Sequence, residues 1–254
     1  MRKFCVQNFR LFVTQAFRPD KILINMPSSN LSIKVGNKTY NRYPIKTHLI
    51  TSDDQLEDVI KKYVLPQVQT DDIISLSERM VAITQGRLVH EDEIKETWLA
   101  KFLIKFVKKW PNDPGFRNAK KMQLVINICG VPRVIFAALV SALTKPFGIR
   151  GLFYILCGHQ VSQIDGFAPG TIPPYDKYAV LGPENPDAVC KKLTEKFKLS
   201  FAIVDANNID VEILGASSDL EITRSELKAA IIDNPSGQGL EQTPIVIVRE
   251  AAVL

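Results

Sequence analysis

Residues Gly182 to Leu214 read GPENPDAVCKKLTEKFKLSFAIVDANNIDVEIL and combine one helix signal with two strand signals. Pro186 followed by Asp187 is typical of a helix N-terminus, so the pattern predicts a helix from Pro186 to Phe197. The next residues, SFAIVDANNIDVEIL, predict two short strands on either side of the polar turn DANN. This helix followed by a strand pair indicates a protein that mixes both element types.

The rest of the chain is mixed in the same way. LSIKV (residues 31–35) and YNRYPIKTHLI (residues 40–50) predict strands joined by a GNK turn, and IISLS (residues 73–77) predicts a buried strand. The other predicted elements are a helix from Leu56 to Val64 capped by Ser52 or Asp53, an amphipathic helix from Trp98 to Val107, apolar helices at Met122–Cys129 and Val134–Leu143, a strand at Gly151–Gly158, a helix at Thr223–Ile232 and a strand at Pro244–Arg249. WPNDPG (residues 110–115) and residues 165–178 predict irregular loops. Because the elements do not alternate regularly, we predict an α+β (mixed α/β) fold with mixed sheets and flanking helices.

Composition restricts the class of partner. The net charge of +5 and pI near 8.9 suit an anionic small ligand, but the basic residues occur as scattered pairs, so we expect no nucleic acid partner. The four cysteines form no CxxC pair, which argues against a zinc site or a disulfide framework and favours a reducing, cytoplasmic compartment.

The apolar segments predict no membrane span. The longest run, VIFAALVSAL (residues 134–143), is shorter than the roughly 20 residues a bilayer needs, so we expect no membrane partner. The first 19 residues contain Arg2, Lys3, Arg10 and Arg18 and no acid, which leaves an organelle transit segment as an alternative to cytoplasmic location. We treat residues 1–30 as an N-terminal extension.

Familiar catalytic patterns are missing from the sequence. It contains no P-loop, no dinucleotide-binding glycine pattern and no Gly-x-Ser-x-Gly elbow. The histidines, His48, His90 and His159, stand alone, so they predict no triad.

Two carboxylates follow predicted strands. Asp205 follows the apolar AIV, and Asp165 opens the loop rich in proline and glycine. Such positions place a side chain in the crevice at a sheet edge. With an oxygen from SGQGLEQ they would make a hard-ligand site for Mg²⁺ or Mn²⁺. Alternatively, both aspartates bond their own backbone in turns.

The stretch DNPSGQGLEQTP (residues 233–244) precedes the last predicted strand. It is longer than the roughly 4–6 residues of an ordinary connection, and it carries Gly237, Gly239, Glu241 and two glutamines. It is either an ordered turn or a loop that binds phosphate and metal.

A resemblance bears on this choice. DDIISLSERMVAITQGR, GPENPDAVCKKL, AIVDANN and SGQGLEQTPIVIVRE occur in an order and spacing similar to the coenzyme F420-0:L-glutamate ligase (gamma-glutamyl ligase) family. The resemblance covers most of residues 43–250 and is strongest in the last 70. It implies a two-lobed domain over residues 31–254, a homodimer, and a GTP-dependent ligase that uses Mg²⁺ or Mn²⁺, with K⁺ as a further cation associated with the family.

The resemblance also implies the site residues. Pro44, Ile45 and Lys46 match a turn that contacts the nucleotide, and Ser77 matches a strand-end serine that touches it. Asp165, Asp205 and Gln238 match the three metal-binding positions, and the two aspartates are the implied catalytic residues. The implied nucleotide loop comprises Ser236, Gly237, Gln238, Gly239, Glu241, Gln242 and Thr243.

Departures from the family pattern leave the substrates open. Ala206 stands where the family has a threonine, and Thr84 stands where it has a basic nucleotide contact. We expect GTP or ATP, L-glutamate and a carboxylate-bearing cofactor or metabolite as substrates, joined through an acyl phosphate. The alternatives are a non-catalytic nucleotide- or cofactor-binding protein on the same fold, and an amide ligase for a folate-like or peptide substrate.

Overall fold

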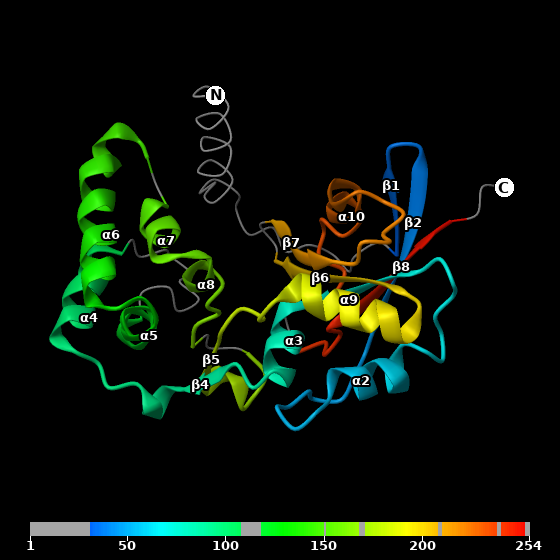
Figure 1. The fold of residues 1–254 in the computed structure, drawn as a ribbon, viewed down its shortest axis with the longest axis horizontal. Helices are drawn as coiled ribbons and strands as arrows, with labels where there is room; N and C mark the ends of the chain where they lie inside the picture. The colour runs from blue at the N-terminus through cyan, green and yellow to red at the C-terminus, as the bar shows by residue number, and fades with distance from the viewer. Residues whose placement is uncertain are drawn as a thin grey trace. The chain divides into compact units, whose positions relative to one another are not determined.

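The structure is a computed structural model that describes residues 31–107, 118–149, 151–167, 171–207, 210–237 and 240–251. They fall into two compact units, drawn together in Figure 1. The sheet unit contains the described parts of residues 23–88 and 182–254, and the helical unit contains those of residues 89–181. The helical unit is therefore a continuous segment between the two halves of the sheet unit.

The sheet unit is built on a six-stranded mixed sheet in the order β1-β2-β8-β3-β6-β7. Its strands are β1 (Ser32–Val35), β2 (Lys38–Ile45), β3 (Ile73–Ser77), β6 (Ser200–Ala206), β7 (Val211–Ala216) and β8 (Ile245–Glu250). β8 lies between β2 and β3 and is antiparallel to both, whereas β3 and β6 are parallel. This sheet, with the surrounding helices, confirms the predicted α+β fold class.

Helices pack against this sheet. They are α2 (Leu56–Tyr63), α3 (Glu78–Thr84), α9 (Pro186–Phe197) and α10 (Arg224–Ala230). α9 contacts β6 and β7, while α10 contacts β1 and β7. Alternate residues of β6, Ala202 and Val204, lie with Leu227 of α10 in one buried apolar cluster. The strand period of two thus gives the sheet an apolar layer for α10.

The helical unit has a separate apolar core. Its helices are α4 (Trp98–Leu103), α5 (Ala119–Cys129), α6 (Val131–Thr144), α7 (Leu152–Cys157) and α8 (His159–Ser162), with 3-10 turns η1 (Glu91–Glu93), η2 (Ile104–Phe106), η3 (Lys145–Phe147) and η4 (Tyr175–Lys177). β4 (Leu88–His90) and β5 (Tyr178–Val180) form a two-stranded sheet. α5 supplies much of the core through Leu124, Val125 and Ile126.

The prediction of a strand at residues 151–158 is wrong, because Leu152–Cys157 form α7. A six-residue apolar run fits a strand or a buried helix equally well. Here Gly151 (φ 82°) and Gly158 (φ 106°) end the helix on either side, and Leu152 and Cys157 are buried. The flanking glycines are helix boundaries, not strand boundaries.

Other predictions differ at their ends. Residues 46–50 are not strand, since β2 ends at Ile45. The N-cap position of α2 is Gln55, not Ser52 or Asp53, and the Gln55 side chain makes no capping hydrogen bond. The predicted irregular stretch 165–178 ends in η4 and the first residue of β5. The WPNDPG loop and residues 1–30 lie outside the described residues.

Glu57 links α2 to α9 and makes the stability of the sheet unit depend on pH. Its carboxylate accepts hydrogen bonds from Lys192 (2.8 Å) and Lys196 (2.7 Å), which lower the pKa of Glu57 to about 2. A depressed carboxyl pKa stabilises the fold above the unfolded value near 4.5, and this contribution is lost as pH falls toward 2. The exposed lysines limit the contribution to about 1 kcal/mol.

We therefore expect Glu57→Gln to lower the free energy of unfolding by about 1 kcal/mol at pH 7. The difference from wild type should shrink as pH falls from 4.5 toward 2. Urea unfolding followed by circular dichroism at several pH values checks this. A difference independent of pH over this range would contradict the ionic origin of the effect.

Candidate functional site

Three segments with predicted nucleotide contacts meet at the edge of the six-stranded sheet that is formed by strand ends, where β2 and β3 end and β8 begins. The backbone N–H of Thr47, just after β2, donates to the Gln242 carbonyl at 2.9 Å. The N–H of Ser77, at the end of β3, donates to the Pro244 carbonyl at 2.8 Å. The chain before β8 is therefore held between the end of β2 and Ser77. The implied turn at Pro44–Lys46 is wrong, because Pro44 and Ile45 are the last two residues of β2 and pair with β8.

Asp205 lies at the same edge. Ser77 pairs with Val204 in the parallel register of β3 and β6, so Asp205 is the next residue beyond that pair. It is half-buried and lies opposite Glu212 of β7. We call Pro44–Lys46, Ser77, Asp205 and the described part of residues 236–243 the edge site. The carboxyl ends of two parallel strands form one side of it, where ligands of open α/β sheets commonly bind.

The loop of the edge site has a defined conformation. Asn234 (φ 49°) is buried, donates through its side-chain amide to the Gly237 carbonyl at 3.1 Å, and accepts from the Gly237 N–H at 3.0 Å. The Thr243 hydroxyl donates to the Ser236 carbonyl at 2.6 Å and closes the loop. Two hydrogen bonds at its start and one between Ser236 and Thr243 therefore hold the described residues on either side of the loop in place.

A larger residue at Gly237 would strain the backbone and displace the Glu241 side chain. The Gly237 φ of 72° is in the left-handed region, and an added Cβ would lie 2.8 Å from Cδ of Glu241. The Glu241 carboxyl group thus packs directly over the glycine. Gln238 and Gly239 lie outside the described residues, so their implied roles stay predictions.

A buried ion pair anchors the start of the loop. The Arg42 guanidinium of β2 pairs with the Asp233 carboxylate, and Arg42 also donates to the Ala230 carbonyl at 3.3 Å. Only 1% of the Arg42 side chain is exposed. The pair ties the sheet to the segment between α10 and the edge site. It is not predictable from local sequence, because the partners are 191 residues apart.

Asp165 belongs to the helical unit. Its backbone forms an isolated bridge with Val180, with both N–H···O distances at 2.9 Å. The stem of Lys121 covers the neighbouring Gly166 so closely that an added Cβ there would lie 2.7 Å from the lysine Cδ. Asp165 is half-buried, and its bridge explains why it stands at a fixed place in an otherwise irregular segment.

The donors implied for a metal are of the right chemical kind. Carboxylate and amide oxygens are the hard ligands that Mg²⁺ and Mn²⁺ take. Within the described ranges, no group of three or more His, Cys, Asp or Glu side chains has a metal-holding arrangement. The assignment of Asp165, Asp205 and Gln238 therefore stays a prediction.

Of the two departures from the family pattern, Thr84 has a local role, and nothing in the structure explains Ala206. The Thr84 hydroxyl donates to the Val81 carbonyl at 2.9 Å, so it serves its own helix α3. The next residue, Gln85, exchanges two hydrogen bonds with the backbone of Glu184, at 3.0 and 2.8 Å. Ala206 is the last residue of β6, opposite Val211, and its methyl group offers no oxygen to a ligand.

His48 does not stand alone, contrary to the interpretation from sequence. It follows Thr47, shortly after the end of β2. Its ring nitrogens contact the Asp54 carboxylate at 2.9 Å and the Tyr63 hydroxyl at 2.8 Å. Burial acts to raise the pKa of Asp54, but hydrogen bonds from Thr51 and His48 outweigh it and hold that pKa below its ordinary value. This Asp–His–Tyr chain beside the edge site has no sequence motif.

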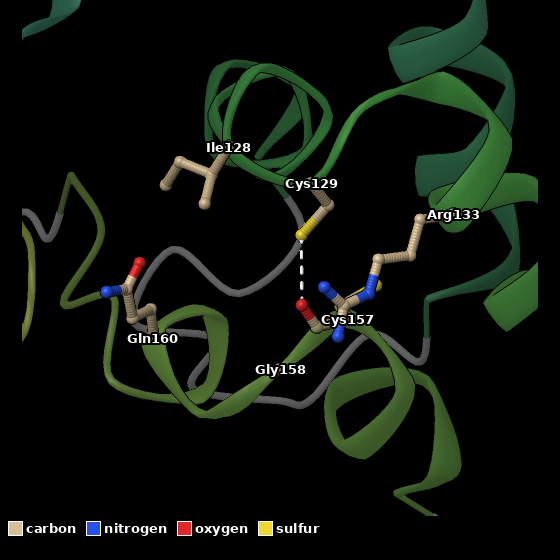
Figure 2. Close-up of a pocket in the computed structure, with 6 residues that line it drawn as sticks. All are labelled: Ile128, Cys129, Arg133, Cys157, Gly158 and Gln160. Carbon is tan, nitrogen blue, oxygen red and sulfur yellow. Dashed lines mark hydrogen bonds between the residues drawn. The ribbon is translucent and has the colours of Figure 1, made fainter.

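The helical unit contains a pocket of about 210 Å³ with two thiols (Figure 2). Cys129 ends α5 and Cys157 ends α7, and the Cys129 thiol donates to the Cys157 carbonyl at 3.2 Å. Arg133 donates to the Leu156 carbonyl at 2.7 Å and lies against Gly158. None of the three cysteines of the described chain is in a disulfide. Because Cys129 and Cys157 are far apart in the sequence, the sequence does not predict that they are neighbours in the fold.

Burial should make two thiols unreactive. It raises the pKa of Cys157 to about 12, with a further rise from neighbouring Cys129, and it raises the pKa of Cys190 to about 12. Since the thiolate is the nucleophile, we expect iodoacetamide at pH 8 to modify both at least about a hundredfold more slowly than in the unfolded chain. Peptide mass spectrometry, with urea-unfolded protein as control, measures this. Equal rates in folded and unfolded protein would show that these thiols are not buried.

Comparison with known proteins agrees with the sequence resemblance. The family model described as F420-0:Gamma-glutamyl ligase matches residues 44–207, which is more than half of the chain. The match includes Pro44–Lys46, Ser77, Asp165 and Asp205 and ends before the loop that precedes β8. None of the curated proteins matches the chain. The protein therefore belongs to the F420-0:gamma-glutamyl ligase family, a family of ligases that add glutamate through a γ-glutamyl linkage.

Proposed function

We propose that the protein is a nucleotide- and divalent-metal-dependent ligase that joins L-glutamate by an amide bond to a carboxylate-bearing cofactor or metabolite. The observation that supports this is the meeting of Pro44–Lys46, Ser77, Asp205 and the described part of residues 236–243 at one edge of the sheet. These segments come from four separate parts of the chain.

The reaction would proceed in two transfers. The γ-phosphoryl group of GTP or ATP passes to a carboxylate oxygen of the acceptor, giving an acyl phosphate and a nucleoside diphosphate. The amino nitrogen of L-glutamate then attacks the acyl carbon, the C–O bond to phosphate breaks, and the amine loses a proton. No covalent bond to the enzyme is needed, so catalysis depends on positioning and on stabilising charge.

The edge site offers groups for these tasks. Lys46 is exposed beside the loop and would pair with nucleotide phosphates. Asp205, with Asp165 and Gln238, would hold a divalent metal. The bound metal would neutralise the negative charge that develops on the phosphoryl group during transfer.

Calorimetry tests the proposal with GTP and ATP, each with and without Mn²⁺, followed by an assay for phosphate release with L-glutamate and a panel of carboxylate acceptors that includes deazaflavin, folate and peptide compounds. We expect metal-dependent nucleotide binding and phosphate release that needs both glutamate and acceptor. Absence of nucleotide binding would overturn the proposal. Binding without release for any acceptor would instead favour a non-catalytic nucleotide-binding protein.

A further inference from the structure

Helix α6 is apolar on nearly all sides but is mostly exposed. Its 14 residues, VPRVIFAALVSALT, include three polar side chains, yet only Val134 and Ala137 are buried. Phe136 is 58%, Leu139 60% and Leu143 71% exposed. A helix that is apolar all round is normally enclosed by protein or lipid. No described residue covers this face of α6, which is the long green helix in Figure 1.

The exposed side chains form a continuous stripe. Phe136, Leu139, Leu143 and, in η3, Phe147 follow one another at intervals of three and four residues, which places those of α6 on one helical face. Phe147 is 82% exposed. We call these four residues the α6 stripe. Its length and its large side chains distinguish it from the single apolar residues that ordinary surfaces expose.

A second segment of the helical unit combines exposed aromatic rings with lysines. Trp98 and Phe102 of α4 and Phe106 of η2 are exposed, and the rings of Phe102 and Phe106 lie edge to face with centroids 5.2 Å apart. Lys101 and Lys105 lie between them and are exposed too. Aromatic rings beside lysines are typical of groups that anchor a protein at the boundary between lipid headgroups and acyl chains.

The positive charge of the segment around α6 favours an anionic partner. Between Thr97 and Arg150 the sequence contains ten Lys or Arg residues and one acidic residue, Asp113. Two of the ten, Lys101 and Lys120, pair with Glu96 (3.5 Å) and Glu91 (2.9 Å) just before this range, and the others give it a positive net charge. Arg133 and Lys145 lie at the two ends of α6 and are exposed. A second copy of this chain would bring two strongly basic surfaces together, which costs energy. Anionic phospholipid headgroups provide the opposite charge.

The dimensions favour a helix on the membrane surface. At 1.5 Å per residue α6 is about 21 Å long, shorter than the roughly 30 Å hydrocarbon core. Within the described residues no single helix has the length and apolar composition to cross a bilayer; α5 with the α6–η3 segment meets both criteria as a pair, but the pair bends by 115°.

We infer that the helical unit binds the surface of anionic phospholipid membranes, with the α6 stripe inserted among the acyl chains and the exposed basic side chains of Lys105, Arg133 and Lys145 on the headgroups. The sequence alone predicts no membrane partner because it lacks a spanning segment. Surface attachment needs no such segment, and the exposure of α6 becomes visible only in the folded unit.

Vesicle sedimentation of the full chain tests this. One set of vesicles is phosphatidylcholine, and the other contains about one quarter phosphatidylglycerol. Wild-type protein should sediment with the anionic vesicles, and less so as salt rises from about 0.1 M to about 0.5 M. The double variant Leu139→Asp/Leu143→Asp should bind at least about tenfold more weakly.

The matched control is Leu65→Asp/Ile232→Asp, which changes two exposed apolar residues of the sheet unit and should bind like wild type. Circular dichroism confirms that each variant is folded. Absence of binding to anionic vesicles, or equal binding by the α6 variant, would overturn the inference. So would a dimer, detected by sedimentation equilibrium, that the α6 variant abolishes, since a second copy would then cover the stripe. The assay contains no nucleotide, so its result is independent of the proposed ligase activity.

Discussion

Asp205→Asn is expected to reduce glutamate addition by at least about a hundredfold without changing the fold. The amide has nearly the shape of the carboxylate, so β6 and its pairing with β3 and β7 should persist. What is lost is the negative charge at the sheet edge beside Ser77. A divalent ion bound near the nucleotide phosphates needs that charge more than it needs the shape of the side chain.

The comparison requires wild type and Asp58→Asn in parallel. Asp58 makes an exposed pair with Lys61 at 2.8 Å on α2, so its loss should leave turnover unchanged. The two measurements are acceptor-dependent phosphate release and Mn²⁺-dependent nucleotide affinity. Full activity of Asp205→Asn would remove Asp205 from the metal site, and equal losses in both variants would point to a general effect of charge.

Asp233→Ala is expected to destabilise the sheet unit by about 3 kcal/mol. The variant leaves the Arg42 guanidinium buried without its carboxylate partner, and an uncompensated buried charge is costly. The loop that begins at Asp233 should also lose its fixed start. Nucleotide affinity should therefore fall together with stability.

A double variant separates charge from packing. Arg42→Met with Asp233→Leu removes both ionic groups and should recover most of the lost stability, since apolar replacement of a buried pair is often neutral. Asp58→Ala, at an exposed pair, is the control and should cost well under about 1 kcal/mol. Both tryptophans fall within residues 89–181, so their fluorescence does not report on the sheet unit.

Circular dichroism in urea and hydrogen exchange of the β2 and β8 amides measure the change where it occurs. Exchange in β2 and β8 that is as slow in Asp233→Ala as in wild type would show that the pair does not stabilise the sheet.

The local sequence correctly predicted the elements whose ends are marked by characteristic residues. The helix from Pro186 to Phe197 agrees with the prediction at both ends because a proline and an acidic residue mark its first turn. The buried strand Ile73–Ser77 was also predicted correctly. The segment Leu152–Cys157 was assigned wrongly, since its apolar residues suit either element and its surroundings in the core decide between them.

The candidate site was predictable only in part. The strand-end position of Asp205 and the glycines near Gly237 are visible in the sequence, and the family pattern supplies Ser77 and Lys46. The contacts between Ser77 and Pro244, and between Arg42 and Asp233, depend on strand order, which no local pattern contains. The same is true of the His48, Asp54 and Tyr63 chain, and of the exposure of α6.

The place of β8 in the middle of the sheet determines the order of events during synthesis. The ribosome makes β8 after every other strand of the sheet, and until about residue 250 has emerged, β2 and β3 each have an edge without a partner. The helical unit, a continuous segment, is complete about 70 residues earlier and is free to fold first. The edge site therefore cannot exist on a nascent chain, which has to be protected from strand-to-strand aggregation until its final strand closes the sheet.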